Sequence, residues 1–328
     1  MGNVLTPNLN YTYNGIETTE VFIKPGVMHP SVTQLFDVIA GVRSKQQMGL
    51  VNQISGITLA DDLSCGNETP SDGVEITNRT LETSPLKIRI DQCADVFANT
   101  IYENLLKTGV DLNDVTGTDV QRLMEEVIVP GIARDAFNIA SFGDTGFTNP
   151  EINQLDGLWT RLIAGVADYC VQREGDFNDI LQTDEALTTF KAMYESAPAI
   201  LDQIPLNEKF FFVTRSVYDN LVSSYESVSN GSDLQVGYNI DGIPFVKYRG
   251  IEVVKLTQWD EAIKSFGLSD PNRAIYTTPS NHVLGFENTN DVTRLDIWYS
   301  QDDDLTKVRG RYKMGYNYKH CDLQVIAF

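Results

Sequence analysis

The sequence predicts an α+β protein with one long helix and a β-rich C-terminal part. Apolar side chains between residues 118 and 141 follow the spacing of a single helix face. Nearly every segment after Arg273 has the pattern of a strand. The elements between these two regions do not alternate strictly as β-α-β units, which favours α+β over α/β organisation. With 328 residues, 42% of them hydrophobic and 21% charged, the chain can bury a substantial core.

The first 47 residues predict an extended arm followed by a short helix. Residues 1–30 are polar, contain Pro and Gly, and show no helical periodicity. Residues 31–47 are assigned as a short helix because apolar side chains recur at helical spacing and Ser31 is a suitable N-cap. These apolar residues are Val32, Leu35, Phe36, Ile39 and Val42.

Residues 48–86 predict a long two-stranded excursion. Short apolar pieces alternate with polar turns at Ser64–Gly66 and Pro70–Gly73. The segment contains little that could pack against itself, so it must dock on another surface or stay mobile. Residues 86–98 then return to strand character.

The strongest single element is the helix predicted for residues 118–141. Thr118 and Gln121 fit a capping box, and 24 residues would extend about 36 Å. Pro130 lies inside the helix and is expected to bend it, while Gly143 and Gly146 are expected to end it. Its apolar face comprises Val120, Leu123, Met124, Val127, Ile128, Ile132, Ala136 and Ile139.

The remaining chain predicts three helices and then mostly strands. The helices are expected at residues 155–170, 183–197 and 215–228, with a buried strand at 209–214. Residues 243–256 contain two strand-like runs around an Arg249-Gly250 turn. The final strands are expected in the segments RAIYTT, HVLGFE, VTRLDIWY, LTKVRGRYKMGYN and CDLQVIAF.

Charge and targeting signals narrow the class of protein. Lys and Arg total 25 against 45 Asp and Glu, a formal net charge of −20, which argues against a general nucleic-acid binder. The start of the chain has neither the basic nor the apolar region of a signal peptide, and no apolar run approaches a membrane span. The widely spaced cysteines are interpreted as free thiols in a reducing cytoplasm. They are Cys65, Cys93, Cys170 and Cys321.

No constellation of residues supports catalysis, so we predict a protein that is not an enzyme and has no cofactor, metal or catalytic residues. The three histidines, His29, His282 and His320, are isolated from one another and are interpreted as surface or packing residues. Phosphate-binding glycine motifs and GxSxG are absent. The acidic triplet Asp302–Asp304 is interpreted as a solvated turn, with cation binding left open.

One basic strand is the candidate functional surface. Lys307, Arg309, Arg311 and Lys313 occupy alternate positions, so all four charges point to the same side. The strand could contact acidic surface on neighbouring subunits, contact nucleic-acid phosphates, or be a solvated face. The acidic balance of the whole chain favours the first interpretation.

The order of these elements resembles the major capsid proteins of tailed double-stranded-DNA bacteriophages. TDVQRLMEEVIVPGIARDAFNIASFGD (118–144) looks like the spine helix of that family, and KFFFVTRSVYDNLVSSY (209–225) like the strand-helix unit of its axial domain. VKYRGIEVVKL (246–256) is similar to a recurring strand of the same domain. The tail, with RGRYKMGYNYKHCDLQVIAF, looks like the closing strands of the peripheral domain.

The resemblance implies a domain plan. It comprises an N-terminal arm (1–30), a short helix (31–47), an extended loop (48–86), a peripheral domain with the spine helix (87–145), an axial domain (146–269) and return strands of the peripheral domain (270–328). The arm and the loop are expected to reach over neighbouring subunits.

The resemblance also implies a function. The chain is expected to form hexamers and pentamers of an icosahedral head, assembled in the bacterial host cytoplasm, with portal, scaffolding and decoration proteins as further partners. Packaged DNA would be enclosed without sequence-specific contacts, the location would be the virion, and no membrane would be involved. An encapsulin-type compartment shell and a small-molecule enzyme of unfamiliar α+β fold are the alternatives.

Two features depart from some members of the family. No Lys lies between Lys45 and Lys87, so the loop lacks the amine of an isopeptide cross-link, and none is expected. No helical segment precedes the arm, so a separate scaffolding protein and no N-terminal cleavage are expected.

Overall fold

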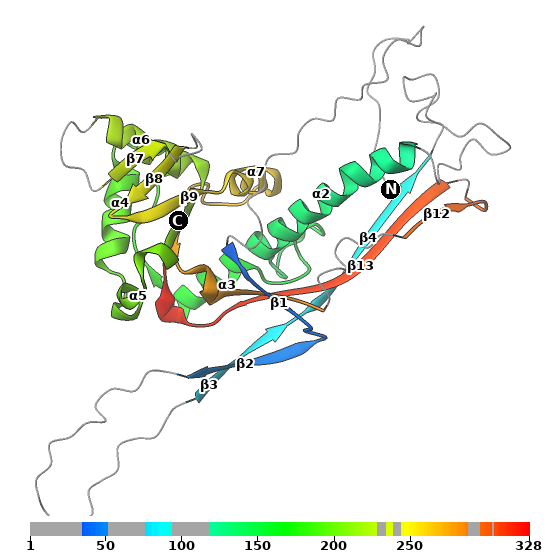
Figure 1. Ribbon diagram of the computed structural model, residues 1–328, viewed down its shortest axis with the longest axis horizontal. Coiled ribbons are helices and arrows are strands. Elements are labelled where there is room, and N and C mark those ends of the chain that lie inside the picture. The colour runs from blue at the N-terminus through cyan, green and yellow to red at the C-terminus, as the bar shows by residue number, and fades with distance from the viewer. Residues whose placement is uncertain are drawn as a thin grey trace, which may run out of the picture.

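The computed structural model describes residues 35–51, 76–93, 119–227, 234–238, 244–287, 296–303 and 305–328. Within these ranges the strands form a five-stranded sheet, a seven-stranded sheet and a two-stranded hairpin, with the helices packed around the two larger sheets (Figure 1). No helix in the described part of the chain is long and apolar enough to cross a membrane. The predicted arm (1–30) and the middle of the predicted loop (52–75) lie outside the described residues.

The long helix α2 spans Asp119–Phe142 and contains Pro130, which confirms the predicted helix almost to the residue. It ends at Gly143, where a side chain would collide with the backbone oxygens of Leu155 and Ile139. Ile128, Ile132 and Ala136 are buried in the main hydrophobic core. The helix therefore lies along the long strands β4 (Ser84–Gln92) and β13 (Leu305–Tyr318) (Figure 1).

The five-stranded sheet is organised around β13, the longest strand. On β13 the inward side chains Val308, Tyr312 and Met314 join the core formed with α2. β13 pairs antiparallel with β4, β11 and β12, and β1 adds to β11 in parallel. The other strands of this sheet are β1 (Asp37–Ala40), β11 (His282–Phe286) and β12 (Asp296–Ser300).

The helix predicted for residues 31–47 is wrong from Asp37 on, although Leu35, the first described residue, is helical. Asp37–Ala40 forms strand β1 and Lys45–Val51 begins the hairpin. The β-branched residues Val38 and Ile39 lie on β1, whose backbone pairs in parallel with β11. Leu35 and Phe36, two of the five apolar residues that suggested a helix, are buried in the core ahead of β1.

A two-stranded hairpin, β2 (Lys45–Val51) with β3 (Ile76–Glu82), projects away from the body (Figure 1). Its described ends have the antiparallel pairing expected for a two-stranded excursion. The base of the hairpin is fixed to the end of β13, where the Asn317 side-chain amide donates to the Thr80 backbone oxygen at 2.8 Å. Gly315 permits this approach, because a side chain there would collide with the Glu82 backbone.

The seven-stranded sheet has the order β5-β14-β10-β6-β9-β8-β7 and is covered on both faces. Phe211 and Val213 point into a core with α4 and α6, whereas Phe212 points into the core with α2, α3 and α7. Burial on both faces explains the uninterrupted apolar run of β6. The strands are β5 (Gln172–Arg173), β6 (Phe210–Val213), β7 (Leu234–Tyr238), β8 (Pro244–Tyr248), β9 (Ile251–Lys255), β10 (Ala274–Thr277) and β14 (Gln324–Ala327).

The helices around this sheet agree in three cases with the predicted ones. The observed elements are α3 (Leu158–Ala167), α4 (Glu185–Glu195), α5 (Ala199–Gln203), α6 (Arg215–Ser227), α7 (Thr257–Phe266), and the short 3-10 helices η3 (Leu206–Glu208), η4 (Pro279–Asn281) and η6 (Cys321–Leu323). The turn between β8 and β9 is at Arg249 and Gly250 as expected, and both residues have positive φ angles, of 48° and 86°.

The domain assignment of the last strands needs correction. We assigned all strands after residue 270 to one domain with the long helix, but β10 and β14 lie inside the seven-stranded sheet. Every residue of β10 and β14 is buried, as interior strands require. The C-terminal segment therefore contributes to both large sheets.

The prediction of four free thiols also needs correction. Cys170 and Cys321 are joined by a disulfide with Cα atoms 5.5 Å apart, whereas Cys93 is free. Cys65 lies outside the described residues. The bonded cysteines follow α3 and β13, two elements that the core brings together.

Candidate functional site

The basic strand predicted from the sequence is the outer face of β13. Arg309 and Arg311 are exposed, and Lys307 and Lys313 are half-buried, whereas the residues between them are buried. The alternation therefore places the four cations on the side of the sheet away from α2. The prediction that these residues share one face is confirmed, and the contact of this face with another subunit stays a prediction.

The neighbouring strand β4 enlarges this surface with two residues that we did not predict from the sequence. The pairing register sets Lys87 opposite Arg311 and Arg89 opposite Arg309. We call these four residues, with Lys307 and Lys313 at the two ends, the basic face. The signal was present in the alternating segment LKIRI, but only the register shows which strand it adjoins.

Carboxylates of the same chain compensate both ends of the basic face. Lys307 pairs with Asp303, and this ammonium lowers the pKa of the Asp303 carboxyl. Lys313 lies 3.0 Å from Glu287. Asp303, the middle residue of the acidic triplet Asp302–Asp304, thus forms an ion pair with Lys307. Asp304 lies outside the described residues.

The centre of the basic face is compensated much less. The Arg309 guanidinium is 3.9 Å from Asp296, and the Arg89 guanidinium is 3.7 Å from Asp91. Within the described ranges, no carboxylate pairs with Lys87 or Arg311, although these two cations are direct cross-strand neighbours. Like charges directly opposite one another destabilise a sheet by roughly 0.2–1 kcal/mol. In a chain with a net charge of −20, this cluster is a specific feature and not a consequence of composition.

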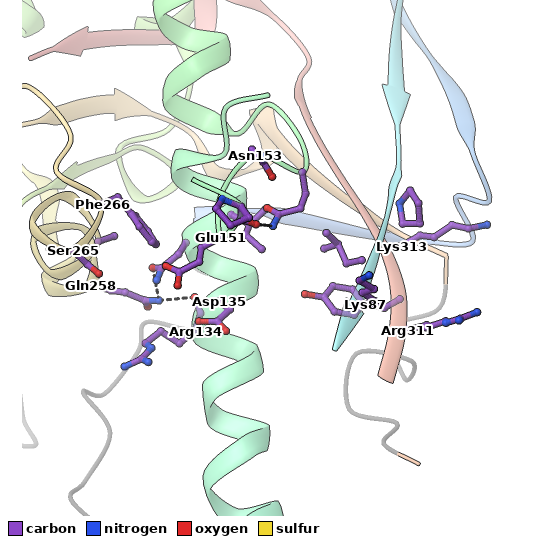
Figure 2. Close-up of a pocket in the computed structure, with 18 of the residues that line it drawn as sticks. Lys87, Arg134, Asp135, Glu151, Asn153, Gln258, Ser265, Phe266, Arg311 and Lys313 are labelled. Carbon is purple, nitrogen blue, oxygen red and sulfur yellow. Dashed lines mark hydrogen bonds between the residues drawn. The ribbon is translucent and has the colours of Figure 1, made fainter. Parts of the chain in front are cut away.

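A hollow of about 1280 Å³ opens beside the basic face, between β4, β13, α2 and α7. Figure 2 shows Lys87, Arg311 and Lys313 on the strand side, and Arg134, Asp135 and Gln258 on the helix side. Burial raises the pKa of the Asp135 carboxyl, and the nearby Glu151 adds to the rise, whereas Arg134 opposes it.

The helix wall of this hollow is structurally fixed. The Gln258 side-chain amide donates to the Arg134 backbone oxygen and to Asn138 Oδ1, both at 2.9 Å. Gln258 belongs to α7, which we did not predict even though its buried residues Trp259, Ala262 and Ile263 recur at helical spacing. Trp259 anchors α7 by donating to Ser141 Oγ on α2 at 3.1 Å.

The buried histidine His282 is arranged for packing and not for proton transfer. His282 is fully buried, and its ring nitrogens contact Tyr316 Oη at 2.8 Å and Thr277 Oγ1 at 3.1 Å. Burial lowers the pKa of His282 to about 3, so its ring is neutral. Among the residues that the structure describes, no three His, Cys, Asp or Glu side chains are grouped to hold a metal ion.

No model of a known protein family matches the sequence, and no curated protein matches it. Solved structures do match. A chain in a structure of the satellite phage P4 procapsid, which includes the size-determination protein Sid, has a TM-score of 0.56 at 11% identity, with 94% of this chain and 93% of that chain covered. A chain in the capsid of an empty GTA particle gives 0.57 at 11% identity, covering 93% and 98%. A structure of Gordonia phage Cozz gives 0.58 at 12% identity, covering 99% and 91%. The chain therefore has the α+β fold of phage capsid structures.

Proposed function

We propose that this protein is a structural subunit that assembles with copies of itself into hexamers and pentamers of an icosahedral phage head, and that it is not an enzyme. The observation that carries the proposal is the extent of the structural likeness, which covers at least nine-tenths of this chain and of three capsid or phage structures. On this proposal the head encloses double-stranded DNA and the location is the virion. Assembly takes place in the host cytoplasm with scaffolding, portal and decoration proteins.

The basic face is the subunit contact that we propose within this function. Lys87 and Arg311 lie at the centre of the basic face, and no carboxylate among the described residues of the same chain forms an ion pair with either of them. An acidic segment of another subunit would supply the missing negative charge. The acidic partner that we propose is the segment 52–75 of a neighbouring copy. This segment contains no Lys or Arg, and complementary patches of this kind fix the register between subunits. Its carboxylates are Asp61, Asp62, Glu68, Asp72 and Glu75.

The test is assembly of the purified protein, alone and together with a scaffolding protein from the same genome. Negative-stain electron microscopy and size-exclusion chromatography with light scattering distinguish closed shells, hexamers and pentamers from monomers. Shells or capsomers support the proposal. A strict monomer or small dimer under both conditions would contradict it. The contents of shells recovered from cells separate the remaining alternatives, because a phage head holds DNA and an encapsulin-type shell holds protein cargo.

A second experiment addresses the contact itself. A variant with the five carboxylates of segment 52–75 changed to amides should fold normally and lose assembly, because the attraction to the basic face is removed. The double variant Lys87→Glu with Arg311→Glu should lose assembly for the same reason. Asp168→Asn with Glu195→Gln is the control, since both carboxylates are exposed and lie outside the basic face.

A charge swap then decides whether the two surfaces meet. Lys87→Glu with Arg311→Glu is combined in one chain with Asp61→Lys and Asp62→Lys, which restores opposite charges across the proposed contact. Assembly that returns in the swapped chain supports segment 52–75 as the partner. Normal assembly of the amide variant would discard this segment, and a swapped chain that still fails would assign another partner to the basic face.

A further inference from the structure

All three sheets meet at one point, and two cysteines and an arginine lie there. Cys321 lies in η6, where the chain leaves β13 of the five-stranded sheet and enters β14 of the seven-stranded sheet. Cys170 follows α3 and precedes β5, which pairs with β14. Arg79 comes from β3 of the hairpin, and its guanidinium lies 2.8 Å from Cys321 Sγ and 3.5 Å from Cys170 Sγ.

Hydrogen bonds outside the disulfide hold both cysteines in place. The Cys170 and Val171 backbone N–H groups both donate to the Gly165 oxygen, at 2.8 and 2.9 Å. On the other side, Asn281 holds the residue before Cys321, because its side-chain amide donates to the His320 oxygen at 2.9 Å and its Oδ1 accepts from the His320 N–H at 2.8 Å. The separation of 5.5 Å between the two Cα atoms is within the ordinary range for a disulfide. The backbone positions of the two cysteines therefore suit a disulfide.

Arg79 gives the pair the surroundings of a reactive thiol site. Its guanidinium stacks 4.2 Å from the centre of the Tyr318 ring, so its position is fixed. A cation next to a sulfur stabilises the thiolate, which is the form that attacks disulfides. The charge of Arg79 also affects the neighbouring His320. Burial is the main cause of the lowered pKa of His320, and the positive charge of Arg79 is the second cause. Both cysteines are only half-buried, so a small oxidant can reach them.

We propose that Cys170, Cys321 and Arg79 form a thiol–disulfide site that reacts with low-molecular-weight disulfides such as glutathione disulfide. The Cys321 thiolate attacks one sulfur of glutathione disulfide, which forms a mixed disulfide and releases one glutathione thiolate. Cys170 loses its proton to solvent and attacks Cys321 Sγ, which forms the protein disulfide and releases the second glutathione thiolate. Two protein thiols are oxidised while one glutathione disulfide is reduced to two thiols.

The site would couple the redox environment to the attachment of the hairpin. Disulfides inside a reducing cytoplasm are usually transient, redox-sensing or catalytic, so the pair would be open during synthesis and closed after release into an oxidising medium. Closure ties the corner after α3 to the corner before β14, and Arg79 transmits this restraint to β3. The inference does not depend on the proposed function, since it concerns the chemistry of a single chain.

The experiment uses the full chain with Cys65→Ser and Cys93→Ser, so that only the pair can react. The reduced protein is incubated with glutathione disulfide at neutral pH, quenched at intervals, alkylated and analysed by intact mass and peptide mapping. We expect both thiols to disappear, a Cys170–Cys321 cross-linked peptide to form, and no glutathione to remain bound. Persistent glutathione adducts, cross-links between chains, or two thiols that stay free would overturn the proposal.

Variants separate the roles of the residues. Arg79→Met should reach the same end point roughly threefold more slowly, because the loss of thiolate fraction is partly offset by a higher intrinsic nucleophilicity. Arg79→Lys keeps the charge and should restore most of the rate. Arg173→Met is the matched control, since Arg173 also stacks on an aromatic ring, 3.9 Å from the centre of Phe328. Equal rates for the parent and Arg79→Met would refute the role of Arg79.

A further pair of variants tests which thiol attacks first. Cys170→Ser should stop at a stable glutathione adduct on Cys321, which lies closer to the guanidinium. Cys321→Ser should react with glutathione disulfide more slowly through Cys170. Equal rates for these two variants would refute the order of attack.

Hydrogen exchange tests the coupling to the hairpin. Amides of β2 and β3 should exchange more slowly in the oxidised parent than in the reduced parent, and Arg79→Met should lose that difference. Identical exchange in both redox states of the parent would contradict the coupling.

Discussion

Replacing Arg311 by Glu should stabilise the isolated subunit and at the same time weaken its assembly. Arg311 lies directly opposite Lys87 on β4, and no carboxylate among the described residues pairs with it. Its neighbours on the same face of β13 are Arg309 and Lys313. A glutamate at position 311 would therefore be surrounded by cations.

The size of the stabilisation follows from the cross-strand pairing. Removing a like-charge pair and creating an opposite-charge pair are each worth roughly 0.2–1 kcal/mol, so the sum is about 1 kcal/mol. Unfolding entropy of about 2.1 cal/mol/K per residue converts this to a rise of roughly 1.5 °C in the thermal midpoint of a chain of this length. Added salt should reduce the rise, because exposed charges are screened.

The assay measures both properties on the same preparation. Scanning fluorimetry at low salt gives the thermal midpoint of the unassembled subunit, and light scattering with electron microscopy gives the yield of shells. We expect a higher midpoint and a lower yield for Arg311→Glu, because the substitution removes the proposed attraction between the basic face and an acidic neighbour. Lys191→Glu on α4 is the matched control: Lys191 is exposed, its substitution changes the net charge equally, and it lies outside the basic face.

Three results would refute this reasoning. A lower midpoint would show that the basic face is not electrostatically frustrated in the isolated subunit. A normal yield of shells, with the higher midpoint retained, would show that the basic face is a solvated surface and not a subunit contact. An equal loss of assembly in Lys191→Glu would attribute the effect to net charge and not to position.

Three further predictions concern the folded subunit. Gly315→Ala should destabilise it by more than about 2 kcal/mol, because the new methyl group meets the backbone at the end of β3. Gly131→Ala should be neutral or slightly stabilising, because among the described residues no atom outside its own helical turn lies within 4 Å of the new carbon, and thermal midpoints compare the two. Burial lowers the pKa of His282 to about 3 in the folded protein, whereas in the unfolded chain the ring accepts a proton below about pH 6.5. The contribution of neutral His282 to the free energy of unfolding is therefore complete above about pH 6.5 and is lost as the pH falls. Between pH 7.5 and about pH 5 the loss amounts to about 2 kcal/mol. His282→Gln should flatten this part of the pH profile in urea titrations. Trp259→Phe should cost about 1–3 kcal/mol in the same titrations, because the indole hydrogen bond to α2 is lost and the smaller ring leaves a void. An unchanged midpoint would contradict its role as the anchor of α7.

The elements that could be predicted are those whose side-chain pattern reflects burial on one face. α2 and β13 have a regular spacing of apolar residues over many residues, and both were located closely. β1 was mistaken for a helix because its flanking residues Leu35 and Phe36 are buried by contacts that are distant in sequence. Its own pairing, in parallel with β11, depends on the tertiary structure and leaves no local signal.

The sequence allowed us to predict the basic residues of one strand, but not the two-stranded surface to which they belong. The alternation on β13 identified four basic residues, but the addition of Lys87 and Arg89 required the register between β4 and β13. The disulfide was missed for a similar reason: Cys170 and Cys321 are 151 residues apart, and only the packing of α3 against the end of β13 brings them together. Contacts of this range are fixed by the fold and not by local patterns.

The place of β14 in the middle of the seven-stranded sheet affects how the protein is made. β14 lies between β5 and β10, so the sheet that begins to form with β6 remains open until residues 324–327 have been synthesised. From Val213 to Ala327 is 114 residues, or about 6–23 s of translation at about 5–20 residues per second. A chain of which fewer than 327 residues have been made therefore still lacks the strand that pairs with both β5 and β10, and the unpaired edges of β5 and β10 stay available to other segments during this interval.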